Sequence, residues 1–207
     1  MVIASTHSMD EFADGARQRG ADQLLSIQGA WQHFKLIQRG FEQNPGVRLS
    51  YYDGRIDILM PEREHEIFGH LIGCLMTIFL ARRGIFFQPT GSMTQERENV
   101  ALVQADESYC LGCPKPIPDL AIEVVFPSGG IHKLPRYQAL GVRKVWFWED
   151  GSLELYHLRT DSYERIQQSE LDELKILDLE LLQQCILIGE TDAGEAVRVF
   201  LESMTEP

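Results

Sequence analysis

The chain has 207 residues, 44% of them hydrophobic and 24% charged, which suits a single domain with a sizeable hydrophobic core. It carries 19 Lys and Arg against 31 Asp and Glu, a formal net charge of −12, which repels a polyanion at long range. Proteins that hold DNA through many phosphate contacts usually present a basic face. Any nucleic-acid function must therefore rest on a local patch, a divalent metal ion or a groove in an oligomer.

The N-terminus and the longest apolar segment argue against export and against a membrane span. The first fifteen residues lack a basic start followed by a long apolar stretch. The apolar segment from Ile67 to Leu80 is interrupted by glycine, histidine and threonine. Cys110 and Cys113 form one C-x-x-C, but neither a second cysteine pair nor a histidine pair accompanies them at zinc spacing. We expect a cytoplasmic protein with reduced thiols and no membrane partner.

The first 60 residues predict an arm, a helix and a hairpin. Residues 1–25 carry weak signals and are expected to form a loosely ordered arm. A helix is expected from Ser26, because apolar residues recur at spacings of three or four on one face, namely Trp31, Phe34, Ile37 and Phe41. The segments Val47–Tyr52 and Arg55–Met60 alternate apolar with polar residues and are joined by Asp53-Gly54, a strong hairpin signal.

The remaining chain alternates between predicted strands and helices, which predicts an α/β or α+β fold with a mixed central sheet flanked by helices in three layers. We expect a single domain over 1–207, with a core over 26–168 and a C-terminal helical extension over 169–207. The expected elements are a helix over 65–83, strands over 85–90 and 100–104 around a polar turn, a loop over 110–118, a strand over 120–126, a helix over 131–140, strands over 144–148, 153–158 and 163–167, and two helices from 177 onward that are separated at Gly189.

Glu123 is the only charged residue in the strand predicted for Leu120–Phe126. The rest of this strand is apolar and rich in β-branched residues, which is typical of a central strand covered on both faces. A bare carboxylate in such a place is costly unless a metal ion or a proton accompanies it. Glu123 is therefore the most informative residue of the sequence.

Asp106 and Lys133 are the charged residues expected near Glu123. Asp106 follows the predicted strand over 100–104, and Lys133 lies in the first turn of the helix that follows the Glu123 strand. Two carboxylates on neighbouring strands can hold Mg²⁺ or Mn²⁺, which prefer oxygen ligands and keep several waters. Such a metal can bind a scissile phosphate and activate water, while a lysine offsets the charge. A plain structural interpretation remains open, with capping carboxylates and a solvated lysine.

Two further predictions concern residues around this group. Asp119 enters the same strand as Glu123 and shares a face with it by the period of two. The only plausible phosphate-facing patch comprises Arg136, Arg143 and Lys144, which lie close to the group in sequence.

The segments PDLAIEVVFPSGG, GVRKVWFW and LELYHL, together with Lys133 and Tyr137, resemble the Uma-two family of endonucleases, a branch of the PD-(D/E)xK nuclease superfamily. Upstream, RLSYYDGRIDILMP with His65-Glu66 resembles the opening hairpin and helix of that family, and ADESY resembles its acidic strand end. The likeness runs from about Trp31 to Leu182. Each motif is weak alone, and their order and spacing together are fairly specific.

The resemblance implies a restriction-endonuclease-like core and a metal-dependent phosphodiesterase site. Asp106 and Glu123 match the acidic pair that holds Mg²⁺ or Mn²⁺, and Lys133 matches a catalytic lysine displaced onto the helix. Glu66 matches a supporting position, and the resemblance also implies a supporting role for Asp119 behind the acidic pair. The usual place of that lysine, two residues after the glutamate, holds Val125. The implied function is an endonuclease that acts on nucleic acid, with DNA as the expected substrate, and homodimers suit this superfamily.

A rival reading treats the chain as a non-catalytic member of the same fold that acts as a binding or assembly module. The net charge of −12 favours this reading. So does His132, because family members often have an acidic residue immediately before the helix lysine. Pro135 is compatible with a first helical turn but can shift Lys133.

Overall fold

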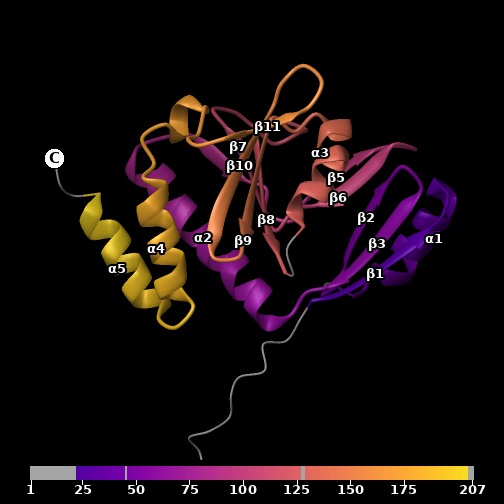
Figure 1. The fold of residues 1–207 in the computed structure, drawn as a ribbon, viewed down its shortest axis with the longest axis horizontal. Helices are drawn as coiled ribbons and strands as arrows, with labels where there is room; N and C mark the ends of the chain where they lie inside the picture. The colour runs from indigo at the N-terminus through magenta and orange to yellow at the C-terminus, as the bar shows by residue number, and fades with distance from the viewer. Residues whose placement is uncertain (1–21, 45, 127–128, 205–207) are drawn as a thin grey trace, which may run out of the picture.

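The computed structural model describes residues 22–44, 46–126 and 129–204, and these residues form two sheets and five α-helices (Figure 1). The first sheet has the spatial order β1-β3-β2-β6-β5, and the second has the order β11-β10-β9-β8-β7-β4. The strands of the first are β1 (Gln23–Gln28), β2 (Arg48–Tyr52), β3 (Arg55–Met60), β5 (Thr94–Arg97) and β6 (Ala101–Gln104). Those of the second are β4 (Phe87–Pro89), β7 (Glu107–Leu111), β8 (Leu120–Val125), β9 (Lys144–Glu149), β10 (Ser152–Leu158) and β11 (Tyr163–Ile166).

The helices are α1 (Trp31–Phe41), α2 (Arg63–Arg82), α3 (Leu134–Leu140), α4 (Leu179–Gly189) and α5 (Ala193–Ser203), with 3-10 turns at Gly130–Lys133 and Asp172–Leu174. Figure 1 shows α2, α4 and α5 on one side of the six-stranded sheet and α3 on its other side, between the two sheets. The helix α1 packs on the far side of the five-stranded sheet.

The mixed sheet and the α+β class are confirmed. The strands β8 and β9 run parallel, and the other strand pairs within the described residues are antiparallel. The hairpin β2–β3 also forms as predicted, with Asp53 and Gly54 at φ 48° and 76°, the left-handed pair that a two-residue hairpin turn requires. The sequence did not indicate that this hairpin belongs to a separate sheet.

Three strands were not predicted. The segment Gln23–Gln28 pairs with β3 along its whole length, so the first helix begins at Trp31 and the expected helix start at Ser26 is wrong. All six residues of β1 are exposed. The segment therefore lacks the alternation of buried apolar and exposed polar residues that marks a half-buried strand. The polar segment Thr94–Arg97 and the segment Glu107–Leu111 are strands held by cross-strand pairing, so the expected loop begins only after Leu111.

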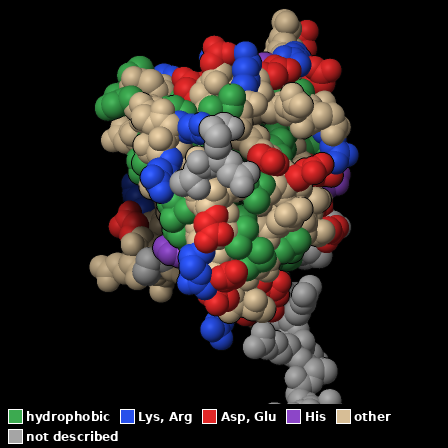
Figure 2. All heavy atoms as spheres, turned by 90° about the vertical axis from the view of Figure 1, so that its left-hand side faces the viewer, with side chains coloured by type: hydrophobic (Ala, Val, Ile, Leu, Met, Phe, Trp, Pro, Cys, Tyr) green, Lys and Arg blue, Asp and Glu red, His purple; other side chains and the backbone are tan. Residues whose placement is uncertain are grey.

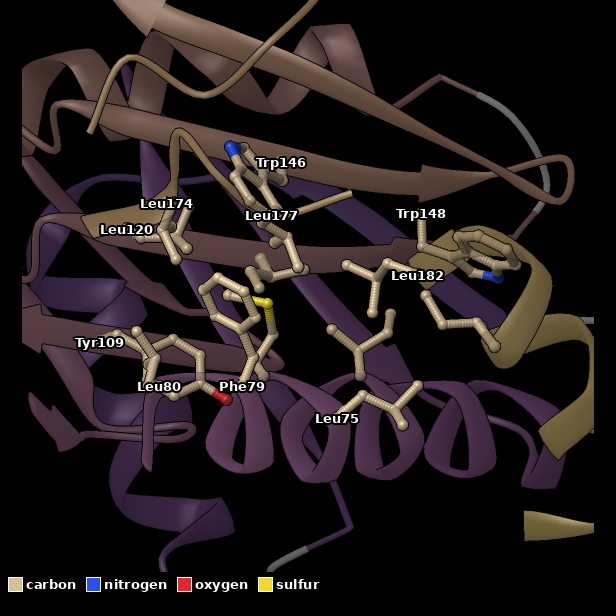
Figure 3. Close-up of a cluster of buried hydrophobic side chains, with 14 of the residues drawn as sticks. Leu75, Phe79, Leu80, Tyr109, Leu120, Trp146, Trp148, Leu174, Leu177 and Leu182 are labelled. Carbon is tan, nitrogen blue, oxygen red and sulfur yellow. The ribbon is translucent and has the colours of Figure 1, made fainter. Parts of the chain in front are cut away.

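The main core lies between the six-stranded sheet and α2, α4 and α5. Figure 3 shows Leu75 and Phe79 of α2 directed toward the sheet that carries Trp146 and Trp148. Both tryptophans are at most 1% exposed and belong to this core. The helix α2 is long and apolar enough to cross a membrane, but its apolar residues are buried in this core, which explains its composition.

The five-stranded sheet has two chemically different faces. Its α1 face is apolar, with Leu49, Tyr51, Ile56 and Ile58 packed against Trp31 and Phe34. The alternate positions face α3 and the second sheet, and they are largely polar or charged: Arg48, Ser50, Arg55 and Asp57. Side chains alternate along a strand, so one hairpin serves both a core and a polar cavity.

Candidate active site

A cavity of about 260 Å³ lies between the two sheets. The five-stranded sheet contributes polar residues of β2 and β3, and the six-stranded sheet contributes the end of β8. The 3-10 turn and α3 supply Lys133 and Arg136. The charged lining residues are Asp22, Arg48, Arg55, Asp57, Glu123, Lys133 and Arg136. In a chain of net charge −12, the cavity thus gathers four of the 19 basic residues.

Glu123 lies at the cavity with only 5% of its surface exposed. Its Oε2 accepts a hydrogen bond from Lys133 Nζ at 2.5 Å, and its Oε1 accepts one from the Tyr137 hydroxyl. Burial alone would raise the pKa of the Glu123 carboxyl, but the Lys133 ammonium and these hydrogen bonds outweigh burial and hold the pKa below its usual range. Glu123 is therefore an ionised carboxylate with a built-in counter-ion.

Tyr137 is the neutral partner of this pair. Burial and the adjacent charge of Glu123 raise the pKa of the Tyr137 phenol well above its usual value. The hydroxyl therefore stays protonated and donates to Glu123, which fixes the orientation of the carboxylate.

Asp106 lies at the point where the chain passes from β6 in one sheet to β7 in the other. Its side chain is 3% exposed, and its Oδ2 accepts a hydrogen bond from the backbone N–H of Val124 at 2.6 Å. Because Val124 follows Glu123 directly, this bond holds the Asp106 carboxylate beside the strand segment that carries Glu123. The helix α2 passes close by at Gly69, where a Cβ would lie 3.8 Å from Asp106 Cβ, an ordinary contact distance.

The start of α2 and the start of β2 supply the other partners of Asp106. His65 is 1% exposed; its Nε2 lies 2.9 Å from Asp106 Oδ1 and its Nδ1 lies 2.6 Å from Asp22 Oδ2. Arg48 forms an ion pair with Asp106 Oδ1, and its Nη2 donates to Glu66 Oε1 at 2.8 Å. Glu66 thus reaches Asp106 only through Arg48, which both residues share.

The turn between β8 and α3 is held from β9. Glu149 accepts hydrogen bonds from the backbone N–H groups of Gly129 and Gly130, at 2.5 and 3.2 Å. A Cβ on Gly130 would lie 2.8 Å from Phe147 Cγ, so only glycine allows this close approach. The packing fixes where the 3-10 turn starts, and Lys133 is the last residue of that turn.

Comparison with known proteins decides the family. The sequence model of the Uma2 family, described as "Putative restriction endonuclease", matches residues 31–187. This chain belongs to the Uma2 family.

A solved structure agrees with the Uma2 assignment at the level of the fold. The crystal structure of a "putative nuclease belonging to DUF820" from Anabaena variabilis superimposes with a TM-score of 0.50 at 13% identity, over 67% of this chain and 90% of that chain. At this identity the likeness shows the fold alone, and it supports the restriction-endonuclease-like core. No curated protein matches the sequence.

Of the candidate site residues named from the sequence of this Uma2 protein, Glu123 and Lys133 line the cavity, and Asp106 and Glu66 are not among its lining residues. Lys133 touches Glu123, Asp106 lies against the strand of Glu123, and Glu66 joins through Arg48. Asp119 does not join them. Its carboxylate accepts hydrogen bonds from Lys115 Nζ and from the backbone N–H of Leu111, because the side chain turns toward the loop that follows β7.

The predicted phosphate-facing patch is wrong for Lys144. This lysine is 1% exposed and pairs with Glu170 at 3.2 Å, so it is buried at the start of β9. Arg136 does line the cavity, where it donates to Ser50 and to Asp57 Oδ2. Arg143 is exposed and is not among the residues that line the cavity.

Sequence reasoning missed several polar residues that line the cavity, among them Asp22, Arg48, Ser50, Arg55 and Asp57. The hairpin alternation offered the one usable signal, since Arg48, Ser50 and Asp57 are its polar positions. No role was assigned to those positions, because a second sheet opposite them was not expected. Asp22 falls in the segment predicted to be a loosely ordered arm.

The donor set suits a hard divalent cation. Asp106 and Glu123 offer buried carboxylate oxygens, the ligands that Mg²⁺ and Mn²⁺ prefer. Over the described ranges 22–44, 46–126 and 129–204, no group of three or more His, Cys, Asp or Glu side chains is arranged to hold a metal. A cation bound by Asp106 and Glu123 would thus need oxygens of water or substrate as further ligands, and Mg²⁺ in proteins usually has such ligands.

Proposed function

We propose that this Uma2 protein is a Mg²⁺- or Mn²⁺-dependent endonuclease that hydrolyses phosphodiester bonds in DNA. The observation that carries the proposal is the Lys133–Glu123 ion pair on a buried central strand, with Asp106 held against that strand. A buried charged group of this kind is costly to maintain, and ordinary packing would replace it with an apolar residue.

Each residue has a role in the proposal that follows from its surroundings. Asp106 and Glu123 would hold the divalent cation, which would supply positive charge at the scissile phosphate and lower the pKa of the attacking water. Lys133 presents its ammonium to Glu123 and to the cavity, where it can orient the attacking water. Tyr137 keeps Glu123 in place as a neutral donor. Arg136 contributes a second fixed positive charge, because Ser50 and Asp57 hold its guanidinium.

The rival function is that of a binding or assembly module with the same fold. Two observations favour it: the net charge of −12, and the internal cations Arg48 and Lys133 that already neutralise Asp106 and Glu123. Figure 2 shows the face formed by α4 and α5, where Asp and Glu side chains lie among hydrophobic side chains and Lys and Arg. The basic side chains of the cavity, among them Lys133 and Arg136, are therefore the feature that would attract DNA.

The experiment that separates the two functions is a cleavage assay. Supercoiled plasmid and single-stranded DNA are incubated with Mg²⁺ or Mn²⁺ and with wild type, Glu123→Gln or Glu98→Gln. Glu98 is an exposed carboxylate between β5 and β6, so its variant is a matched control. We expect Glu123→Gln to lose about 100-fold or more of the cleavage rate, since loss of even an outer ligand of a metal site costs about 10–100-fold. Equal cleavage by wild type and Glu123→Gln, or none by either, would favour the rival.

A further inference from the structure

Arg48 is the residue that connects Asp106 to Glu66. It begins β2, and its side chain is 17% exposed. Its Nη2 donates to Glu66 Oε1 at 2.8 Å, while its Nη1 pairs with Asp106 Oδ1 and lies 3.2 Å from His65 Nε2. One guanidinium therefore neutralises the same carboxylate that the proposed function assigns to a metal ion.

The acceptor capacity of Asp106 is nearly filled in this arrangement. Its Oδ2 accepts from Val124, and its Oδ1 faces both His65 and Arg48. A carboxylate offers about four acceptor positions in total. A divalent cation at Asp106 would compete with Arg48 for Oδ1, and two cations in contact at one buried oxygen would repel each other.

We propose that Arg48 is the resident counter-ion of Asp106 and that it exchanges with the divalent cation. In the metal-free protein Arg48 holds Asp106. When the cation binds, Arg48 releases Asp106 and stays on Glu66. This inference rests on the proposed function, because it takes Asp106 to be a metal ligand. It makes Arg48 and Glu66 positioning residues that set the affinity for the metal.

The surroundings of Arg48 allow this exchange. Glu66 is 56% exposed at its side chain, so it can follow the guanidinium toward solvent without breaking a packed contact. Arg48 also lines two cavities, the one of about 260 Å³ that holds Glu123 and a second of about 300 Å³ beside the end of α1. The guanidinium therefore has open space on either side. On the Glu123 side it would lie with Lys133 and Arg136, and the three positive charges could bind a phosphate group.

Arg55 provides a matched comparison within the same cavity. It is also a β-strand arginine of the hairpin, and its Nε donates to Asp57 Oδ1 at 2.8 Å. Within the part of the chain that the structure describes, Arg55 pairs with Asp57 and Ser26 and forms no hydrogen bond or ion pair with Asp106. Removal of Arg55 therefore changes the charge of the cavity by the same amount as removal of Arg48 while leaving the counter-ion of Asp106 in place.

The test measures Mn²⁺ binding by calorimetric titration, and thermal unfolding with and without Mn²⁺, for wild type, Arg48→Met, Arg48→Gln and Arg55→Met after treatment with EDTA. We expect both Arg48 variants to bind Mn²⁺ more tightly than wild type by about tenfold or more, because they remove a unit charge in contact with the ligand oxygen. They should also unfold at a lower temperature without metal and gain more from Mn²⁺. Arg55→Met should bind Mn²⁺ within about twofold of wild type, since its charge lies at Asp57 and is more screened.

The outcomes separate this inference from the proposed function. If the Arg48 variants bind Mn²⁺ as wild type does, or more weakly, the exchange is wrong and the metal site stands. If Arg55→Met gains as much affinity for Mn²⁺ as the Arg48 variants, the gain comes from the lower total positive charge of the cavity, and the exchange is wrong as well. If no protein binds Mn²⁺, both the metal site and the exchange fall. Arg48→Gln keeps a polar side chain of intermediate length, so it provides the measurement if Arg48→Met does not fold.

Discussion

The ammonium nitrogen of Lys133 lies 2.5 Å from Oε2 of Glu123, although the two residues come from different elements. Glu123 sits within β8, and Lys133 ends the 3-10 turn that leads into α3. The position two residues after the glutamate, where the superfamily usually has its lysine, is Val125, which packs in the core between β8 and α3. The 3-10 turn before α3 therefore supplies the positive charge that β8 does not carry itself.

This pair predicts an asymmetric response to mutation. Lys133→Met leaves Glu123 buried without its counter-ion, and we expect a loss of about 2–4 kcal/mol in the free energy of unfolding, somewhat less than for a fully buried pair because Lys133 keeps some exposure. The double variant Glu123→Gln with Lys133→Met leaves no buried charge and should lose less. Urea denaturation at pH 7 in EDTA measures both. Equal losses would mean that Glu123 has enough other partners to remain charged without Lys133.

The contact of Gly130 with Phe147 predicts a steric effect on the same lysine. In Gly130→Ala the new Cβ would lie 2.8 Å from Phe147 Cγ and 3.0 Å from Glu149 Oε2, so the turn must move. We expect a loss of about 1–3 kcal/mol in unfolding free energy, typical of overpacking. Gly40→Ala is the control, because its Cβ meets nothing within 4 Å on α1 and should stabilise by about 0.5–1 kcal/mol. A neutral Gly130→Ala would show that the turn does not depend on this packing.

Glu107 predicts a pH dependence of stability. Burial raises the pKa of its carboxyl to about 7, against the opposing influence of Arg48. In an unfolded chain the pKa of a glutamate is about 4.3, so between about pH 4.3 and 7 the folded state keeps a proton that the unfolded state has lost. Stability is thus highest below this window, falls across it as the pH rises, and levels off above it.

Glu107→Gln removes this titration. We expect the variant to be more stable than wild type by about 1 kcal/mol at pH 8, with allowance for the partial exposure of the carboxylate, and to show no slope from Glu107 between about pH 4.3 and 7. Thermal unfolding in EDTA at several pH values from about 4.3 to 8 measures the difference in stability between the two proteins. Parallel pH profiles of the two proteins would mean that Glu107 titrates normally.

The sequence identified the residues whose signal is local. Glu123 was found because one charge interrupts an apolar run, and Lys133 because it lies in the first turn after that strand. Arg48 and Asp57 could not be assigned, because their roles depend on which face of the β2–β3 hairpin meets the second sheet. That choice is made by long-range strand pairing, such as Tyr51 opposite Leu102, which no local pattern encodes.

The strand β1 shows that prediction of the fold from the sequence has the same limit. Its residues are exposed, so neither propensity nor alternation separates Gln23–Gln28 from a helix or an arm. Only the register with β3, from Gln23 opposite Met60 to Gln28 opposite Arg55, makes it a strand. Asp119 was misplaced for a related reason, because the period of two predicts the face of a side chain but not the hydrogen bonds that it finds there.

Asp22 precedes β1 and forms hydrogen bonds with the start of α2. Its Oδ1 accepts from the backbone N–H of Glu62, the N-cap residue of α2, at 2.9 Å, and its Oδ2 lies 2.6 Å from His65 Nδ1. Burial would raise the pKa of the Asp22 carboxyl, but the hydrogen bonds from His65 and Glu62 lower it, so the carboxylate is ionised at neutral pH. The Asp22 carboxylate thus orients the histidine that contacts Asp106.

Asp22→Ala removes the acceptor for Glu62 and one partner of His65, and we expect a loss of about 1–2 kcal/mol in unfolding free energy, similar to loss of a helix cap. Hydrogen exchange should quicken at the amides of the first turn of α2, and the imidazole NMR signals of His65 should shift. Asp178→Ala is the matched control, because Asp178 caps α4 by accepting from Leu181 N at 3.0 Å and lies on a different helix. It should quicken exchange in α4 alone and leave His65 unchanged. If Asp22→Ala behaves in the same way as this control at His65, the Asp22 carboxylate is a cap and does not position the site.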